Sequence, residues 1–162
     1  MSISLYRASV PVFVRAFGNL SAILKKGEAH GGAALVDARL APDMLTLAGQ
    51  VQRASDAAKS AAARLSGLDN PSFPDTEKTF AELHARIKKT VDFLQGVKPG
   101  QIDGGEQREI VVKAGGRELK FTGLDYLFGF ALPNFYFHVT TAYDILRHEG
   151  VQLAKMDYLG SY

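Results

Sequence analysis

The chain has 162 residues, of which 46% are hydrophobic and 22% are charged, and its net charge is +2. This charge is too small for the basic surface of a nucleic-acid-binding protein, and no stretch approaches the roughly 18 continuous apolar residues of a membrane-spanning helix. The absence of cysteine excludes disulfides, thiolate metal sites and a cysteine nucleophile.

We expect residues 1–162 to form a single domain, because domains of about 100–150 residues are the most common. Residues 1–7 lack the basic segment and apolar core of a signal peptide. Together with the lack of cysteine, this favours a cytoplasmic protein. We expect neither nucleic acid nor a membrane as a partner.

Near the N-terminus, apolar residues recur at alternating steps of three and four, which is the pattern of a helix packed along its length. These residues are Ile3, Tyr6, Val10, Phe13, Phe17, Leu20 and Leu24. Pro11 lies within the pattern, and we expect it to kink the helix or to mark its start. Lys25 and Lys26 favour a helix end at Gly27, followed by a loop that contains His30.

A second helix is predicted to begin at residues 41–43, where Pro42 suits a first helical turn and Asp43 suits the positive end of the helix dipole. Gly67 is its expected end. Its apolar positions are Met44, Leu47, Val51, Ala54, Ala58, Ala61 and Leu65. The alanines in this set let a neighbouring helix approach closely.

A third helix is predicted after the loop at residues 70–74, with Asp75 or Thr76 as its cap and an end near Gly96. Its apolar positions are Phe80, Leu83, Ile87, Val91 and Leu94, and His84 flanks them.

Residues 110–121 change to a period of two, which is typical of strands. With Gly115 and Gly116 as a two-residue turn, the sequence pairs Ile110 with Phe121, Val112 with Leu119 and Ala114 with Arg117. These matched pairs predict a β-hairpin. It has to pack on the helices, because a lone two-stranded hairpin is marginally stable.

The final part of the chain is predicted to hold two more helices. Thr122 caps a short one that ends before Pro133. The last long helix then runs from Pro133, which suits a first turn, to Gly150, which suits the left-handed position after a helix. The tail beyond Gly150 is apolar, so we expect it to pack on the other helices or on a second subunit.

Four long amphipathic helices with a hairpin inserted before the last one predict a mainly α fold, a four-helix bundle. Such bundles build their sites from side chains on facing helices. Polar residues on the apolar faces are therefore the candidates for function.

His138 is the leading candidate, because it lies among apolar and aromatic residues of the last helix, on one stripe with Asn134, Thr141 and Ile145. It is either a buried histidine that hydrogen-bonds within the protein, or a metal ligand or general base. A second histidine four residues later would place two imidazoles on one face, but Ala142 stands there.

Other candidates lie on the remaining helices. Gln50 is near the edge of the second helix's apolar stripe. It is either an amide that faces the surface or is hydrogen-bonded in the core, or a member of a functional site. His84 is either half exposed at a seam between helices or directed at the interior. Tyr6, Tyr126, Tyr136 and Tyr143 either line an aromatic cavity or fill the core.

Several classes of enzyme are excluded by missing motifs. The chain has no phosphate-binding loop, no dinucleotide-binding glycine pattern, no nucleophile elbow and no metalloprotease helix motif. It also lacks the paired Glu-x-x-His motifs of di-iron carboxylate bundles.

Three segments resemble an uncharacterised bacterial family, a domain of unknown function. They are residues 4–6, Ser-Leu-Tyr; residues 40–44, Leu-Ala-Pro-Asp-Met; and residues 133–151, from Pro-Asn-Phe-Tyr-Phe-His to His-Glu-Gly-Val. That family is similar in fold to the DinB/YfiT-like proteins, which are four-helix bundles, often dimeric, and many of them regarded as metalloenzymes. The resemblance spans nearly the whole chain and implies this fold, with a homodimer as the expected assembly.

The resemblance also implies where a metal would be held. In the wider superfamily one histidine of the second helix and two histidines of the last helix, four residues apart, bind a divalent metal such as Zn or Ni. His138 is the first histidine of the last-helix pair, Ala142 replaces the second, and Gln50 occupies the second-helix position. Only one of the three imidazoles remains.

Three functions follow as hypotheses. The leading one is a protein that binds a small, partly apolar ligand between helices, near His138, Tyr143, Gln50, Asn134, Tyr6 and the hairpin. The second is a metal-dependent hydrolase or transferase in which His138 binds metal with an unexpected partner such as His84 or a carboxylate. The third is a non-catalytic dimeric interaction module whose apolar tail forms the interface.

Overall fold

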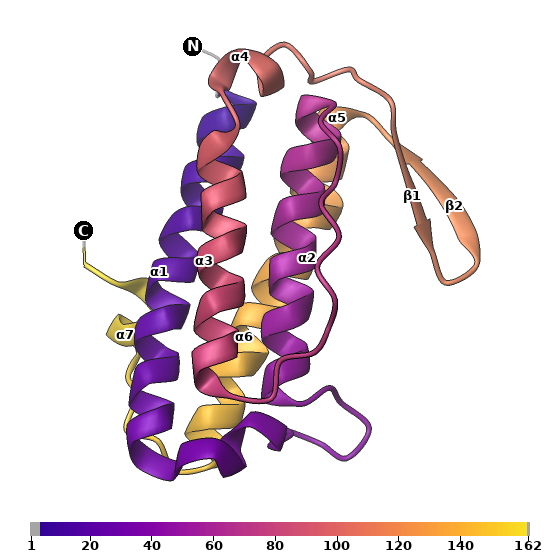
Figure 1. The fold of residues 1–162 in the computed structure, drawn as a ribbon. Coiled ribbons are helices and arrows are strands. Elements are labelled where there is room, and N and C mark those ends of the chain that lie inside the picture. Colours follow the sequence, from indigo (N-terminus) through magenta and orange to yellow (C-terminus); the bar gives the residue numbers. More distant parts are fainter. Residues whose placement is uncertain (1–3, 162) are drawn as a thin grey trace.

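The computed structural model describes residues 4–161, with the backbone only at Ala114. Its elements in chain order are α1 (Leu5–Gly31), η1 (Gly32–Asp37), α2 (Leu47–Ser66), α3 (Phe80–Gly96), α4 (Pro99–Ile102), β1 (Ile110–Ala114), β2 (Arg117–Phe121), α5 (Gly123–Tyr126), η2 (Leu127–Ala131), α6 (Leu132–His148) and α7 (Lys155–Leu159). Figure 1 shows the long helices α1, α2, α3 and α6 lying side by side, with the hairpin beside α2 and away from α1. The fold is mainly helical, as the sequence predicts. No helix within residues 4–161 combines the length and apolar content that crossing a membrane requires.

Aromatic packing joins the first and last long helices. Phe13, Phe17 and Phe135 are fully buried. The Phe135 ring packs edge to face against Phe13 and Phe17, with centroid distances of 4.8 and 5.2 Å. The predicted apolar stripe of the first helix therefore forms part of the core, except that Ile3 lies outside the described residues.

The prediction that the first helix ends at Gly27 is wrong. The helix continues to Gly31, and His30 is in its last turn. Gly27 is buried where a Cβ atom would lie 2.8 Å from the Leu146 side chain, so this glycine permits close helix packing. Gly32 has the positive φ of 60° that follows the helix end. Pro11 lies inside α1, and the helix continues on both sides of it.

Two predicted helix starts are also wrong. The second helix begins at Leu47, where the Thr46 side chain accepts a hydrogen bond from the Gly49 backbone, and not at residues 41–43. The third begins at Phe80, where Thr79 and Glu82 form a reciprocal capping box. In both cases a threonine that bonds to the first turn fixes the start more strongly than the proline or aspartate upstream. The predicted end at Gly67 is confirmed, because this residue has a left-handed φ of 75°.

The hairpin forms in the predicted register. Ile110 pairs with Phe121, Val112 with Leu119 and Ala114 with Arg117. Gly115 and Gly116 have φ values of 57° and 73°, which is the conformation of a two-residue turn with both central residues left-handed. Ile110 and Val112 are buried, so the hairpin packs on the helices.

The helix predicted to end before Pro133 instead continues through it. From Gly123 the chain is helical to His148, by way of the π-helical turn η2. The Leu132 N–H bonds to the Leu127 carbonyl, five residues back, and this widens the turn. Pro133 has no N–H to donate and its ring crowds the carbonyl four residues back, so a wide turn just before it lets the helix persist. Thr122 caps this segment as predicted.

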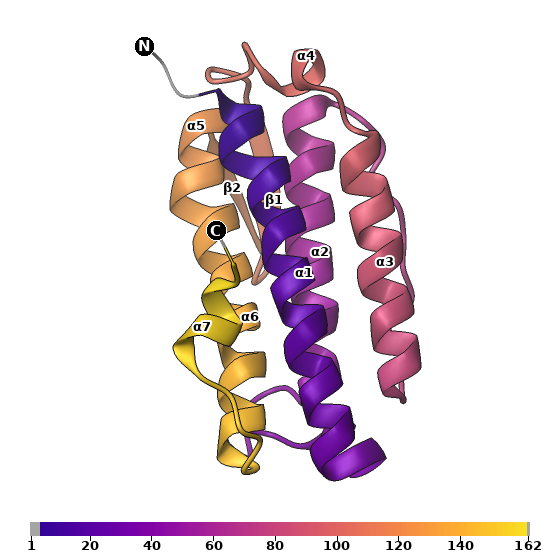
Figure 2. The same cartoon turned by 90° about the vertical axis from the view of Figure 1, so that its left-hand side faces the viewer.

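The apolar tail packs on the helical body of the same chain. Figure 2 shows α7 lying against α1 and α6. Arg15 Nη2 donates to the Leu159 carbonyl at 2.9 Å, and Asn19 Nδ2 donates to the Tyr158 carbonyl at 3.0 Å. Val151 and Leu153, which precede α7, are buried. This is one of the two predicted locations of the tail.

We predict that Gly123→Ala destabilises the fold, because a Cβ atom there would overlap the Gly105 carbonyl oxygen. The expected loss of unfolding free energy is about 1–3 kcal/mol, measured by chemical denaturation and circular dichroism. Gly129→Ala is the matched control in the same helical segment, since no atom lies within 4 Å of its added carbon. Equal stability of the two variants would contradict the prediction.

Candidate functional site

A cavity of about 380 Å³ lies between α2, the segment from α5 to α6, and the hairpin. One wall is the face of α2 with Arg53, Asp56, Ala57, Ser60 and Arg64. The opposite wall carries Tyr126, Phe130, Ala131, Asn134 and His138. The hairpin contributes Val112 and Lys113. The predicted candidates His138 and Asn134 thus share one cavity beside the hairpin.

His138 is held by Gln50 across the interface between α6 and α2. The distance from His138 Nδ1 to Gln50 Oε1 is 2.8 Å. Gln50 is 1% exposed, whereas His138 is only partly buried and lines the cavity. The structure therefore brings together two of the candidates on which the resemblance centred.

The Gln50 amide decides which imidazole nitrogen of His138 carries the proton. Gln50 Nε2 faces the Leu45 carbonyl at 3.4 Å, which leaves Gln50 Oε1 toward His138. An amide oxygen can only accept, so His138 Nδ1 must donate. Nε2 then keeps a lone pair, and none of the described residues hydrogen-bonds to it. His138 is arranged as an acceptor or base at the cavity.

The surroundings of His138 favour the uncharged form of its imidazole. Burial, and secondly the positive charge of Arg53, lower the pKa of its imidazole below the ordinary value of about 6.5. The neutral form is the one that accepts a hydrogen bond at Nε2.

Asp56, which also lines the cavity, is committed to partners within the protein. Its carboxylate lies 3.3 Å from Arg53, 3.1 Å from Lys59 and 3.0 Å from Arg86. Arg53 in turn pairs with Asp75 as well. The negative charge of Asp56 is thus balanced before any ligand binds.

Of the other candidates, Tyr126 lines this cavity, whereas Tyr143, Tyr6 and His84 lie away from it. Tyr143 packs its ring against Tyr158, with 5.9 Å between centroids. Tyr6 is at the start of α1, where its backbone N–H donates to Asp103. His84 Nδ1 lies 2.9 Å from Ser21 Oγ, between α3 and α1. None of the three is among the residues that line the cavity.

The donor set does not fit the three-histidine metal site that the resemblance implies. Ala142 offers no ligand and is fully buried. The Gln50 oxygen is already engaged by His138 Nδ1. Within the described residues, no group of three histidine, aspartate or glutamate side chains could hold a metal ion. His138 therefore has no metal-binding partners in this arrangement.

Sequence reasoning missed the α2 wall of the cavity. Arg53, Ala57, Ser60 and Arg64 follow steps of four, three and four, so they share one face of the helix. That spacing was available from the sequence. It marks a polar stripe beside the alanine-rich one, and the polar stripe faces the cavity.

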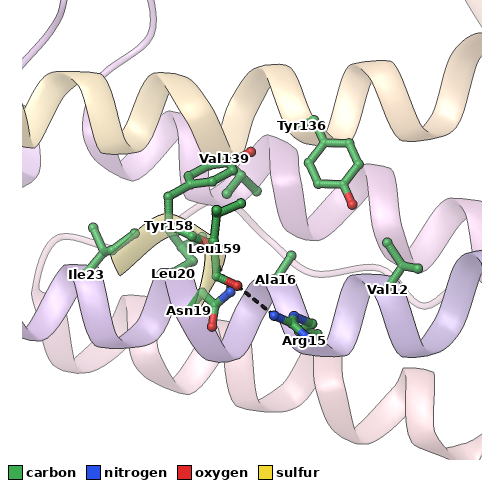
Figure 3. Close-up of a pocket in the computed structure, with 10 residues that line it drawn as sticks. All are labelled: Val12, Arg15, Ala16, Asn19, Leu20, Ile23, Tyr136, Val139, Tyr158 and Leu159. Carbon is green, nitrogen blue, oxygen red and sulfur yellow. Dashed lines mark hydrogen bonds between the residues drawn. The ribbon is translucent and has the colours of Figure 1, made fainter. Parts of the chain in front are cut away.

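A second pocket, of about 230 Å³, lies between α1, α6 and α7 and is more apolar. Figure 3 shows Tyr136 pointing from α6 toward α1, and Arg15 bonded to the carbonyl of Leu159. It contains the candidate Tyr136 but not His138. Its polar side chains from α1, Arg15 and Asn19, hold α7 by hydrogen bonds to backbone carbonyls, so we place the site at the His138 cavity.

We predict that His138 carries its proton on Nδ1 at pH 7 and titrates with a pKa below 6.5. Long-range ¹⁵N–¹H NMR spectra report both properties. In Gln50→Leu the acceptor for Nδ1 is gone, so the preference for this tautomer should fall. His148, exposed at the end of α6, should give unchanged signals in both proteins. A proton on Nε2 of the unmodified protein would contradict the assignment.

Comparisons with known proteins agree with the fold. Residues 5–159 match the family model described as Domain of unknown function (DUF1993). The structure is similar to that of a DinB family member protein from Shewanella denitrificans, with a TM-score of 0.87 and 38% identity over 98% of this chain and 93% of that one. No curated protein matches the chain. The chain therefore belongs to the DUF1993 family and is a DinB-like protein whose family function is uncharacterised.

Proposed function

We propose that this protein binds a small molecule in the cavity beside His138, without a metal ion. The observation that carries the proposal is the fixed imidazole, with Nδ1 bonded to a buried amide and Nε2 open at a cavity. Ligand sites commonly combine apolar walls with a few positioned polar groups. Here Val112, Phe130 and Ala131 supply the apolar surface.

The setting of these groups supports the same proposal. We infer that the long helices α1, α2, α3 and α6 form a DinB/YfiT-like four-helix bundle, a class of fold that builds sites between facing helices. His138 and Gln50 come from two such helices. A metal-dependent hydrolase or transferase is the weaker hypothesis, since the donor set does not fit a metal.

The proposal predicts small molecules that raise the melting temperature of the protein and lose this effect in His138→Ala. The effect should persist with a chelator present. Binding of a ligand that donates to Nε2 should weaken as the pH falls through the pKa of His138, because the protonated ring no longer accepts. A thermal-shift screen followed by calorimetry measures this.

His148→Ala is the matched control, because this histidine is exposed at the other end of α6. Small molecules that raise the melting temperature of His138→Ala as much as that of His148→Ala would contradict the proposal. Hits that need added Zn or Ni would favour the metal-dependent hypothesis instead.

We also propose a second function, as a homodimeric interaction module. Large apolar side chains are exposed on the helical segment from α5 to α6 and on α7. They are Leu124, Phe128, Tyr136, Phe137 and Met156. A contiguous exposed apolar patch often marks a contact with another protein, and we infer that these side chains form such a patch.

This second proposal predicts a dimer by light scattering at micromolar concentration. Phe137→Ser should shift the protein toward the monomer. The Phe137 side chain is 56% exposed, so the substitution removes an aromatic ring from the proposed interface. Val111→Ser on the hairpin is the control, since this apolar side chain is also exposed but lies elsewhere. A monomeric unmodified protein would contradict the proposal.

A further inference from the structure

The guanidinium of Arg64 has no carboxylate partner among the described residues, and a hydrogen bond to a buried group holds it at the cavity. Its Nη1 donates to the Tyr126 hydroxyl at 2.9 Å, and no described carboxylate lies within ion-pair distance of it. Tyr126 is 1% exposed, so the oxygen that holds Arg64 is fixed within the protein. Arg64 is thus a positioned cation that lines the cavity.

The remaining charges leave the cavity positive. Arg53 is balanced by Asp56 and Asp75, and Asp56 is shared with two further cations. Lys113 reaches the cavity from the hairpin, where Glu118 is its cross-strand neighbour without an ion pair in the described structure. Arg64 and Lys113 are therefore the cavity cations without an ion pair in the described structure, and of the two only Arg64 is held in place by a hydrogen bond to a buried side chain.

The two walls place Arg64 and His138 toward opposite ends of the cavity. On α2, Arg64 follows Gln50, the partner of His138, by 14 residues, which is about 21 Å along a helix. On the facing wall, Tyr126, Phe130, Asn134 and His138 follow at steps of four. One end therefore has the guanidinium and phenol, and the other has the imidazole and amide.

We infer that the ligand is an elongated, partly apolar carboxylic acid, whose carboxylate pairs with Arg64 and whose other end donates a hydrogen bond to His138 Nε2. The inference rests on the proposed function of the cavity and names its class of ligand. A single planar guanidinium matches one carboxylate in a two-bonded arrangement. Phosphate esters, with about two charges, would call for a denser cluster of cations.

A purely structural role for Arg64 makes a different prediction. Arg64 is in the last turn of α2, where a positive charge is favourable for the helix dipole. In that case Arg64→Met would lower stability and leave ligand binding unchanged. Binding and stability therefore have to be measured on the same variants.

The probes are 4-hydroxyphenyl alkanoic acids of increasing chain length. The phenol can donate to His138 and the carboxylate can accept from Arg64. Each acid is compared with its primary amide, with the phenyl acid that lacks the hydroxyl, and with the phosphonate of the same length. Affinities are measured by calorimetry, and ¹⁵N NMR follows the Arg64 guanidinium signals.

We expect the acids to bind at least about tenfold more tightly than their amides, as a charge-assisted pair requires. Arg64→Met should remove this difference, and Arg64→Lys should restore part of it. His138→Ala should weaken the hydroxyphenyl acids while leaving the phenyl acids unchanged. Lys88→Met, an exposed cation on α3, is the control and should bind like the unmodified protein.

Three outcomes would overturn the inference. If the amides bind as tightly as the acids and their binding still depends on His138, the proposed function holds, but a carboxylate is not what the cavity recognises. Phosphonates that bind more tightly than carboxylates would replace the assigned ligand class. No binding of any acid and no change in the Arg64 signals would refute the ligand class, whereas the screen against His138→Ala tests the cavity separately.

Discussion

The missing N–H of Pro133 is the constraint on which the site depends. A regular α-helix would direct the proline ring at a carbonyl one turn earlier, and the widened turn at residues 127–131 relieves this conflict without ending the helix. Tyr126 and His138 therefore belong to one continuous helical segment. Because that segment is continuous, a phenol next to the hairpin and an imidazole more than three turns later line the same cavity.

A network of buried charges supports the opposite wall. The Arg86 side chain is 1% exposed and contacts Asp56, Asp75 and Glu77. Burial alone would raise the pKa of Glu77, but hydrogen bonds, including one from Arg86, outweigh it and the pKa is lowered. The same aspartates hold Arg53, whose charge helps to keep His138 neutral. The loop before α3 thus helps, through Asp75, to hold Arg53 in place beside the cavity.

The hairpin and its register could be predicted because a Gly-Gly pair permits few backbone conformations and the apolar residues match across it. The helix starts at Leu47 and Phe80 were harder to predict from the sequence. Each is fixed by a threonine side chain that hydrogen-bonds to the first turn, and this contact is visible only in the structure. The Gln50–His138 contact joins residues 88 positions apart. Only the family resemblance brought them together in advance.

Two candidates were placed elsewhere for geometric reasons. Tyr143 follows His138 by five residues, which turns it by about 140° around the helix. Its ring consequently meets α7 and not the cavity. Arg64 was overlooked because a basic residue in a last helical turn is expected from its favourable interaction with the helix dipole. Only its position at the cavity suggests a role in binding.

The sequence of the hairpin can change without disturbing the packing of the helices. Its strands pair only with each other in the described structure, so no hydrogen-bonded ladder ties them to the helical body. Yet Val112 and Lys113 form part of the cavity wall. Under the proposed function, changes in this insertion alter which molecules the cavity accepts while the helices keep their packing. Relatives with divergent hairpins would then be paralogues that differ in selectivity on a common scaffold.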